Sequence, residues 1–400
     1  MNPFQAIPVS EHVHWVGAID WELRDFHGYA TTRGTSYNAF LLTAGEVTLI
    51  DTVKAPFRDE LMARIASITE PGKIRTIISN HAEMDHSGCL PGLIETLKPQ
   101  RVFASSLGAQ ALHDHFGLTN ITPVQDGQKI DVGKAELTFY ETRMLHWPDS
   151  MFTWYGGDGV LFSNDAFGMH LASVERFTDE LPWSLIEQET AKYYANILMP
   201  LSKLVARLAE RLATLALPIK LLATDHGPIW RKDISRAMEL YLRWARQVKT
   251  RKAVIVYDTM WGSTAKMARA IAEGLREGGA AARLMPMSGT DRSEVATELL
   301  EAGAILVGSP TLNRNMFPTL ADVMTYVKGL APRNLIGAAF GSYGWSSQAV
   351  GQLTDILRQM DVEVVDEGVA AVYVPNDEAL DRCRALGRRI ADRLAERIKG

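Results

Sequence analysis

The alternation of apolar and polar positions divides the 400-residue chain into two parts that predict different structures. In the first part, short apolar runs typical of β-strands each end at a loop with side chains that can bind metals. The predicted strands of this kind cover residues 74–78, 135–140, 160–162 and 219–223. Because loops beyond strand ends converge while the strands hold them rigidly, we expect these four loops to share one site.

From residue 253 onward, apolar strands alternate with amphipathic helices. The pattern predicts strands at residues 253–257, 282–285, 304–308, 335–341 and 370–374. It predicts helices at residues 264–276, 293–300, 320–330, 347–360 and 377–398. This alternation indicates a parallel, doubly wound sheet with helices on both faces, in which ligands bind beyond the carboxyl ends of the strands.

The two parts meet after a predicted helix at residues 234–244. The basic stretch 246–252 is interpreted as a solvated linker, and a docking patch for an acidic electron donor is the alternative. The predicted domains therefore cover residues 1–248 and 253–400. All ten histidines lie at or before His226, which indicates that the two domains carry different chemistry.

Potential metal ligands cluster after the predicted strands of the first part. Four of them stand within six residues: His81, Glu83, Asp85 and His86. The others each follow one of the remaining strands: His146, Asp165 and His226. Imidazoles and carboxylates at this density repel one another or need desolvation unless a cation gathers them. Asp165 alone is more typical of a turn or helix cap, but as part of this set it is predicted to be a ligand.

Three loops of the second part follow predicted strands, and the first of them suits a ligand with a phosphate group. The loop at 258–264 offers hydroxyls, a glycine and backbone amides before a helix N-terminus, which favours a phosphate. It has neither the lysine of a P-loop nor the glycine pattern of a dinucleotide site, so a mononucleotide is indicated. The loops at 308–313 and 340–346 follow two other strands, and any one loop alone is more often a plain turn.

These three loops resemble those of flavodoxins, and the resemblance implies a bound flavin mononucleotide whose predicted binding residues are Thr259, Met260, Trp261, Gly262, Ser263, Thr264, Pro310, Thr311, Leu312, Asn313, Ser342, Tyr343, Gly344 and Trp345. Among these, Trp345 is an aromatic residue that suits stacking on the flavin ring, although surface packing is the ordinary alternative.

The ligand spacing of the first part resembles that of the metallo-β-lactamase fold, and Asp51 resembles the Asp that ends an early strand of that fold. The second histidine of the hydrolase motif His-x-His-x-Asp-His is Glu83 here. Because hard anionic oxygens stabilise oxidised ions, this carboxylate favours iron or manganese, although it does not exclude zinc. The three loops of the second part resemble those of flavodoxins. The fold expected from both resemblances is α/β, an N-terminal metallo-β-lactamase-like αββα sandwich followed by a C-terminal flavodoxin-like doubly wound parallel sheet.

The whole chain resembles one family, the flavodiiron proteins, and the resemblance includes the segments 25–29 and 35–40 near the start. The resemblance implies that one iron is bound by His81, Glu83 and His146. It implies that the other is bound by Asp85, His86 and His226, with Asp165 as the bridge. In some members the histidine equivalent to His86 points away from the metal. His27 is implied to lie in the second shell and hydrogen-bond the substrate, and the alternative is a buried histidine satisfied by backbone.

The resemblance also implies the function. Electrons from an external donor (a rubredoxin or a flavin/NADH reductase) pass through FMN to two irons, which reduce O2 to water, NO to N2O, or both. The choice between the two substrates is left open, and the second-shell candidates for it are Tyr193, Tyr194, Trp147 and Met151. The expected assembly is a head-to-tail homodimer or a dimer of dimers, in the short form without a fused rubredoxin.

Two other functions compete with this one. The first is a zinc or mixed-metal hydrolase of the metallo-β-lactamase fold, regulated by a flavodoxin-like module. Glu83 counts against it. The second is a plain electron carrier whose metal site is structural, which an open pair of redox-capable sites disfavours.

Composition narrows the setting of the protein. A formal net charge of −5 gives no support to nucleic-acid binding. The sequence has neither a signal-peptide pattern at its start nor an apolar stretch long enough to cross a bilayer. Cys89 and Cys383 lie in different halves and are expected to stay unpaired, which fits the cytoplasm and excludes cysteine-ligated iron.

Overall fold

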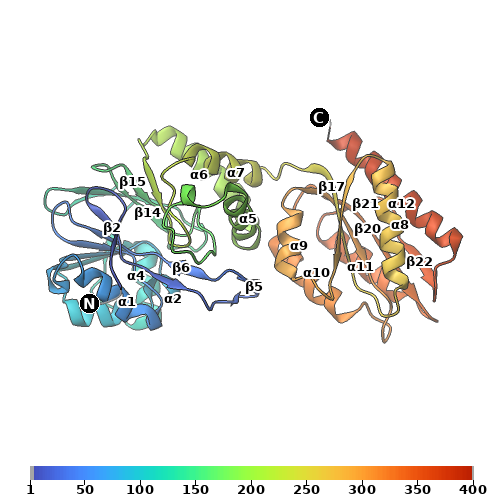
Figure 1. Cartoon of the computed structure of the whole chain (residues 1–400), viewed down its shortest axis with the longest axis horizontal. Coiled ribbons are helices and arrows are strands. Elements are labelled where there is room, and N and C mark those ends of the chain that lie inside the picture. Colours follow the sequence, from blue (N-terminus) through green and yellow to red (C-terminus); the bar gives the residue numbers. More distant parts are fainter. Residues whose placement is uncertain (1–3, 399–400) are drawn as a thin grey trace. The chain divides into compact units, whose positions relative to one another are not determined.

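The computed structural model describes residues 4–398, and the chain folds into two compact units (Figure 1). The first unit comprises Met1–Tyr193 and Lys203–Leu242, and the second comprises Tyr194–Ser202 and Arg243–Gly400. The short segment Tyr194–Ser202 thus packs with the second unit although it lies within the sequence of the first. The sequence pattern does not predict that this segment belongs to the second unit.

Two large sheets form the core of the first unit, which also contains two sheets of two strands each. The larger sheet has the strand order β1 (Ile7–Pro8), β2 (Val13–Trp15), β7 (Phe40–Leu42), β8 (Thr48–Ile50), β9 (Thr76–Ser79), β10 (Arg101–Ser105), β11 (Thr122–Val124). The smaller sheet has the order β12 (Lys129–Asp131), β13 (Glu136–Glu141), β14 (Met151–Tyr155), β15 (Val160–Phe162), β16 (Leu221–Ala223). All four strands predicted for this part are present, with ends that differ by two residues or fewer from the predicted ones.

The inner faces of the two sheets share one apolar core, in which Phe40 of β7 contacts Phe162 of β15 with ring centroids 5.3 Å apart. A second apolar cluster lies between the outer face of the larger sheet and three helices, α1 (Arg58–Ala66), α3 (Leu90–Leu97) and α4 (Ser106–Phe116). Helix α6 (Ser202–Leu215) lies against the smaller sheet, where Arg211 covers the ring of Tyr140 in β13. The predicted αββα sandwich is therefore confirmed.

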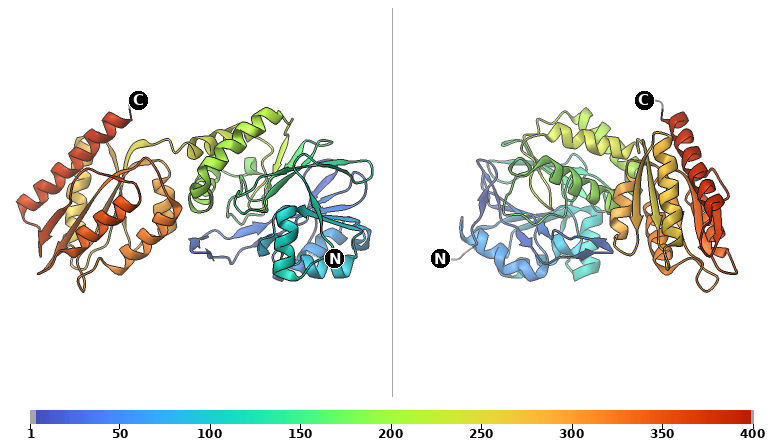
Figure 2. Two further views of the ribbon diagram at one scale, coloured as in Figure 1. Left: turned by 180° about the vertical axis from the view of Figure 1, so that it is seen from behind. Right: turned by 45° about the vertical axis from the view of Figure 1, so that its right-hand side comes forward.

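The second unit is built on one parallel sheet. Its order is β18 (Ala281–Pro286), β17 (Thr250–Tyr257), β19 (Ala302–Gly308), β20 (Ile336–Tyr343), followed by a split edge of β21 (Glu363–Val364) and β22 (Val369–Val372). Five helices cover it: α8 (Ser263–Glu277), α9 (Arg292–Leu299), α10 (Pro318–Leu330), α11 (Gln348–Gln359) and α12 (Asp377–Arg397). Helices α8 and α12 pack on one face and α9, α10 and α11 on the other (Figure 2). The predicted doubly wound sheet is confirmed.

The edge of this sheet differs from the prediction. Both short strands pair with β20, β21 along Ile336–Gly337 and β22 along Phe340–Tyr343. The two-residue strand β21 is too short to give a recognisable apolar alternation. The last predicted strand was expected to reach residue 374, but β22 ends at Val372, so Tyr373 and Val374 lie in the following loop.

The prediction of a solvated linker at 246–252 is wrong for much of that stretch. Gln247 and Lys249 are buried, and residues 250–252 already belong to β17. The Nζ atom of Lys249 donates hydrogen bonds to the carbonyl oxygens of Leu299 and Leu300, at 3.0 and 3.1 Å. These carbonyl groups lie at the end of α9, where the helix dipole favours a cation. The Lys249 side chain is therefore bound to the end of this helix and does not extend into solvent.

Among residues 4–398, no helix combines the length and the apolar composition that crossing a membrane would require.

The contact between the two sheets gives a first prediction. Phe40→Ala removes a fully buried ring from the sandwich core, and we expect a loss of about 3–5 kcal/mol in the free energy of unfolding. Val174→Ala, at a side chain that is 69% exposed, is the control and should change that free energy by less than about 0.5 kcal/mol. Urea unfolding followed by tryptophan fluorescence measures both. Equal effects would show that the two sheets do not depend on this contact.

Candidate metal centre and flavin pocket

The seven predicted metal ligands lie in two adjoining groups in the first unit. Donor atoms within 4.8 Å of one another form a first group of His81, Glu83, His146 and Asp165, and a second of Asp85, His86 and His226. The ligands come from the loops after β9, β13, β15 and β16 and from the short helix α2 (Met84–Ser87). The convergence of loops expected from the sequence is therefore present.

Asp165 lies between the two groups. Its Oδ2 atom is 3.2 Å from His146 Nε2 and 3.4 Å from His81 Nε2. Its Oδ1 atom is 3.3 Å from His86 Nε2, in the other group. Each oxygen of this one carboxylate thus faces a different group, which is the geometry that a bridging ligand needs.

The polar atoms of the cluster fit a bound cation. Asp85 and Asp165 are buried, yet both oxygens of Asp85 and Oδ2 of Asp165 have no partner in hydrogen-bond geometry among the described residues. Both nitrogens of the fully buried His86 ring are also without such a partner. Buried polar atoms without partners are costly, and a metal ion coordinated by them would remove that cost.

The electrostatics of the groups point the same way. Burial alone would raise the pKa of Asp165, but the charges of His86 and His146 beside it hold that pKa well below its usual range. Burial alone would lower the pKa of His81, but its hydrogen bonds to Asp149 and Glu83 raise it to about 10. The carboxylates are therefore ionised and demand positive charge, which protons supply in the absence of a metal.

Partners behind the imidazoles orient them toward the cluster. Asp149 accepts hydrogen bonds from His81 Nδ1 at 3.1 Å and from the backbone amide of Ala82 at 2.6 Å. His226 Nδ1 donates to the carbonyl oxygen of Ser36 at 2.8 Å. In both rings this leaves Nε2 directed at the carboxylates, as in carboxylate–histidine–metal arrangements. Sequence analysis missed Asp149 and Ser36, because neither is spaced like a ligand.

The side chain of Asn38 and a glycine turn hold the loop that carries His226. The side-chain amide of Asn38 donates to the carbonyl oxygens of Thr224 at 2.7 Å and Gly227 at 2.8 Å. Gly227 has a φ of +74°, and a Cβ atom there would lie 2.6 Å from Met169. Only glycine fits this turn, so the histidine before it has a defined position.

His27 projects from the hairpin of β4 (Asp25–Phe26) and β5 (Tyr29–Ala30). Its Nε2 atom is 3.3 Å from Glu83 Oε1, and its side chain is 76% exposed. The alternative of a buried histidine satisfied by backbone is therefore wrong. The ring stands on the solvent side of the cluster, where a small substrate would arrive.

The four candidates for selectivity separate into two kinds. Trp147 stands edge-on to His81 at 5.2 Å, and the buried Tyr193 ring lies 6.1 Å from that of His226. Tyr194, in contrast, packs on Trp244 in the second unit, and Met151 is buried in β14. Trp147 and Tyr193 are the two that lie beside the predicted ligands.

A cavity of about 680 Å³ lies at the carboxyl ends of β17, β19 and β20 in the second unit. Its lining residues are Met260, Trp261, Ser263, Pro310, Thr311, Leu312, Asn313, Arg314, Ser342, Tyr343, Gly344, Trp345, Ser346, Tyr373 and Val374. Eleven of the fourteen predicted flavin-binding residues are among them. Sequence analysis missed Arg314, Ser346, Tyr373 and Val374, the last two because they were assigned to a strand.

The remaining three predicted residues shape the first loop. Thr259 Oγ1 accepts a hydrogen bond from the amide of Gly262 at 3.0 Å, and Thr264 Oγ1 lies 3.0 Å from Ser342 Oγ. Gly262 has a φ of +85° and no side chain caps the start of α8 at this point. Amides at a helix start that no side chain occupies fit a phosphate group.

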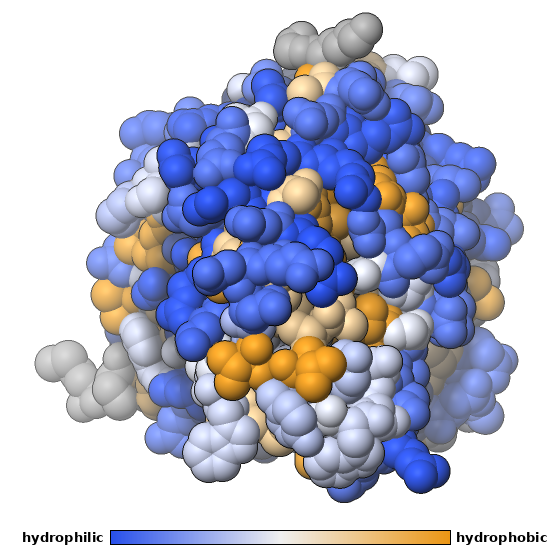
Figure 3. Space-filling model, turned by 90° about the vertical axis from the view of Figure 1, so that its right-hand side faces the viewer, coloured by the Kyte–Doolittle hydropathy of each residue, from blue (hydrophilic) through white to orange (hydrophobic). Residues whose placement is uncertain are grey.

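The outer rim of the cavity is aromatic and apolar. Trp261 is 94% exposed and Trp345 is 87% exposed, beside the exposed Tyr373 and Val374. The space-filling view of this end of the molecule shows a group of apolar and aromatic side chains at its lower edge (Figure 3). Exposed indole and phenol faces fit a planar flavin ring.

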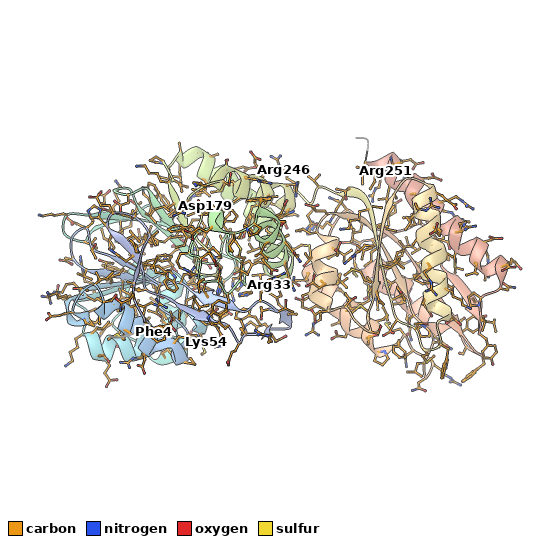
Figure 4. All side chains as sticks on the ribbon, viewed as in Figure 1. Phe4, Arg33, Lys54, Asp179, Arg246 and Arg251 are labelled. Carbon is orange, nitrogen blue, oxygen red and sulfur yellow. The ribbon has the colours of Figure 1, made fainter. Side chains whose placement is uncertain are left out.

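This position also counts against a donor docking site at 246–252. Arg246 and Arg251 lie at the edge where β17 begins (Figure 4), whereas the cavity lies beyond the end of that strand. The eight residues of β17 span roughly 26 Å at the usual rise per residue. A donor bound to the basic stretch would therefore be far from the cavity.

Comparisons with known proteins agree with both sites. A family model described as "ODP family beta lactamase" matches residues 35–227, and one described as "Flavodoxin" matches residues 255–387. The chain is 43% identical over 397 residues to a nitric oxide reductase of Moorella thermoacetica, covering 98% of this chain and 100% of the relative.

Two solved structures are similar over nearly their full length. The rubredoxin oxygen:oxidoreductase of Desulfovibrio gigas superposes with a TM-score of 0.97 at 40% identity, covering 99% of this chain and 100% of that one. The flavodiiron protein of Giardia intestinalis superposes with a TM-score of 0.95 at 34% identity, covering 98% and 97%. Full-length identity at this level, with a seven-residue metal cluster in one unit and a flavin-sized cavity in the other, shows that the chain belongs to the flavodiiron protein family.

Proposed function

We propose that this chain is an oxidoreductase that reduces O2 to water, NO to N2O, or both, with FMN and two irons as cofactors. The observation that carries the proposal is the pair of adjoining ligand groups joined by Asp165, in a chain that also has a flavin pocket. The relatives named as nitric oxide and oxygen reductases favour this function over a zinc hydrolase with a regulatory module. The 76% exposed side chain of His27 contacts Glu83, so one candidate ligand lies next to a residue that solvent reaches, which counts against a purely structural metal.

We assign the ligands as the resemblance to the flavodiiron proteins implies. His81, Glu83 and His146 would hold one iron, Asp85, His86 and His226 the other, and Asp165 would bridge them. The two facing distances of Asp165 and the unpartnered atoms of Asp85 and His86 support this division. We likewise propose a di-iron domain at 1–248 and an FMN domain at 253–400, with the segment Tyr194–Ser202 packed on the second.

When bound, the two irons and the flavin supply the electrons of the reduction. The residues around them would position the substrate and deliver protons. His27, on the solvent side of Glu83, can donate a hydrogen bond or a proton to an oxygen atom held beside that carboxylate. Burial raises the pKa of Tyr193 well above its usual value. Its hydroxyl group, next to Asp165, therefore stays protonated and can donate a hydrogen bond.

An external electron donor is needed, and we propose a rubredoxin or a flavin/NADH reductase in a reducing cytoplasm, where the free Cys89 and Cys383 stay reduced. We also propose a head-to-tail homodimer or a dimer of dimers. The exposed Trp261 and Trp345 support this assembly, since large apolar side chains at a cofactor edge are usually covered by a partner.

The first functional test concerns the bridge. Asp165→Ala should lower the iron content from about two per chain, because it removes a ligand that both groups share. The anaerobically reduced wild-type protein should consume metered O2 or NO. The rate of consumption by the variant should be at least tenfold lower. Elemental analysis and gas-electrode measurements follow both quantities. Stoichiometric zinc, with no consumption of either gas after reconstitution with iron, would contradict the proposal.

The second test concerns the flavin. Ser263→Asp places a negative charge at the start of α8 beside the flavin phosphate, and we expect FMN to bind at least tenfold more weakly. Thr325→Asp adds the same charge at an exposed position of α10 outside the cavity and serves as the control. Fluorescence titration of the flavin-free protein measures both affinities. Equal affinities in the two variants would exclude the assigned phosphate position.

The third test concerns the assembly. If flavin and irons meet only across two chains, mixing Glu83→Ala with Ser263→Asp should restore activity that neither has alone. Each heterodimer would pair one intact flavin with one intact metal site and reach about half the wild-type rate, by two-fold symmetry. A chemical reductant should be used, so that the donor protein does not limit the rate. Absence of recovery in heterodimers whose exchange has been verified would mean that electrons pass within one chain.

A further inference from the structure

A buried carboxylate next to the metal cluster has no assigned role. Asp225 precedes His226 in the loop after β16, and its side chain is fully buried. Neither of its oxygens has a hydrogen-bond partner among the described residues. The neighbouring buried Asp51, in contrast, accepts hydrogen bonds from the amide of Asn80 at 2.7 Å and from its side chain at 2.6 Å. A buried carboxyl group without a hydrogen-bond partner is costly, so a folded protein that keeps one needs a reason.

The group that Asp225 faces is His86. Oδ2 of Asp225 lies 3.6 Å from His86 Nδ1, a few tenths of an ångström beyond a normal hydrogen bond. On the other side of the ring, Nε2 faces Asp85 Oδ1 at 3.4 Å and Asp165 Oδ1 at 3.3 Å. The imidazole therefore stands between one carboxylate behind it and two in the cluster.

The backbone of His86 is held independently of its ring. Its carbonyl oxygen accepts hydrogen bonds from the amide of Thr52 at 3.1 Å and from the Thr52 hydroxyl at 2.5 Å. The main chain at this residue is thus fixed, and what remains to be set is the rotation of the imidazole. The carboxylate behind the ring is placed where it can set that rotation.

The other buried imidazoles of the cluster show the same arrangement completed. His81 has Asp149 behind its Nδ1 atom, and His226 has the carbonyl oxygen of Ser36. Both contacts leave Nε2 directed at the cluster. Asp225 stands in the corresponding place for His86. The Nδ1 atom of His86 has no other acceptor near it among the described residues.

We propose that Asp225 is the positioning residue of His86. Asp225 accepts a hydrogen bond from the Nδ1–H group of His86, which leaves Nε2 unprotonated and directed at the cluster. In this way Asp225 makes His86 a metal ligand in this chain. The inference rests on the proposed di-metal site and deepens it.

Three variants and one control test the proposal with Co²⁺ as a divalent probe. Asp225→Leu removes the acceptor at similar volume, whereas Asp225→Asn keeps an acceptor oxygen. Asp149→Asn makes the matching change behind His81, in the other group. His86→Gln identifies the contribution of that ring. Metal-free protein is titrated calorimetrically, and proton NMR of the cobalt form follows the shifted, exchangeable N–H signals of ligating imidazoles.

We expect Asp225→Leu to bind one Co²⁺ as the wild type does and the second 10–100-fold more weakly. It should lose the same N–H signal that is absent from His86→Gln. Asp225→Asn should be intermediate, and Asp149→Asn should weaken the other site and alter a different signal. A merely structural role would lower stability without removing one specific imidazole signal.

The proposal is overturned if Asp225→Leu binds both ions as the wild type does and keeps every N–H signal. If that variant does not fold, Asp225→Ala, which also removes the acceptor, decides: weakening of the site that contains His86 supports the proposal, and unchanged binding overturns it. A wild type that binds fewer than two ions would refute the di-metal site itself, which separates the failure of the proposed function from the failure of this inference.

Discussion

The structure depends on the burial of Asp165 between imidazoles of two ligand groups. A carboxylate taken out of water is expensive, and only a set of positive or hydrogen-donating groups on both sides makes it tolerable. His146 and His81 face one oxygen and His86 faces the other, each within 3.4 Å. These groups come from different strand ends, so the sandwich must bring its loops together within a fraction of an ångström. The Asn38 contacts and the turn at Gly227 show how much of the unit serves that placement.

The grouping of the seven candidate ligands in one place could be predicted from the sequence because they follow the ends of strands. Four ligands within six residues, and one more after each of three strands, follow from the way a strand delivers its last side chain to a loop. Asp149, Asp225 and Ser36 could not be predicted in this way. Each acts through a contact with a ring far away in sequence or on a different loop, and nothing in its spacing separates it from an ordinary Asp or Ser. Only the packed structure reveals that each lies behind an imidazole.

The flavin pocket shows the same division. The loop before α8 is a contiguous motif, and its residues were found from the sequence together with the loops after β19 and β20. Tyr373 and Val374 were missed because apolar, β-prone residues continue the pattern of β22 past the point where pairing with β20 ends. Tertiary pairing, which local alternation does not contain, determines where a strand stops. The packing of Tyr194–Ser202 with the second unit is another feature that local alternation does not contain, because it depends on which surface those residues contact.

The charge of the metal site also bears on the choice of metal. Glu83, Asp85 and Asp165 bring three negative charges to the site, which offset most of the charge of two ferrous ions. Two ferric ions carry two more positive charges, and in a buried site this difference is poorly screened. Asp149, buried directly behind the His81 imidazole, has a pKa that its contact with His81 holds below the usual range, so it can offset this charge without occupying a coordination position. Zinc sites use such carboxylates as well, since a carboxylate behind an imidazole orients the ring and raises its basicity. The carboxylate-rich ligand set and the full-length relatives, and not the residues behind the rings, therefore favour iron over zinc.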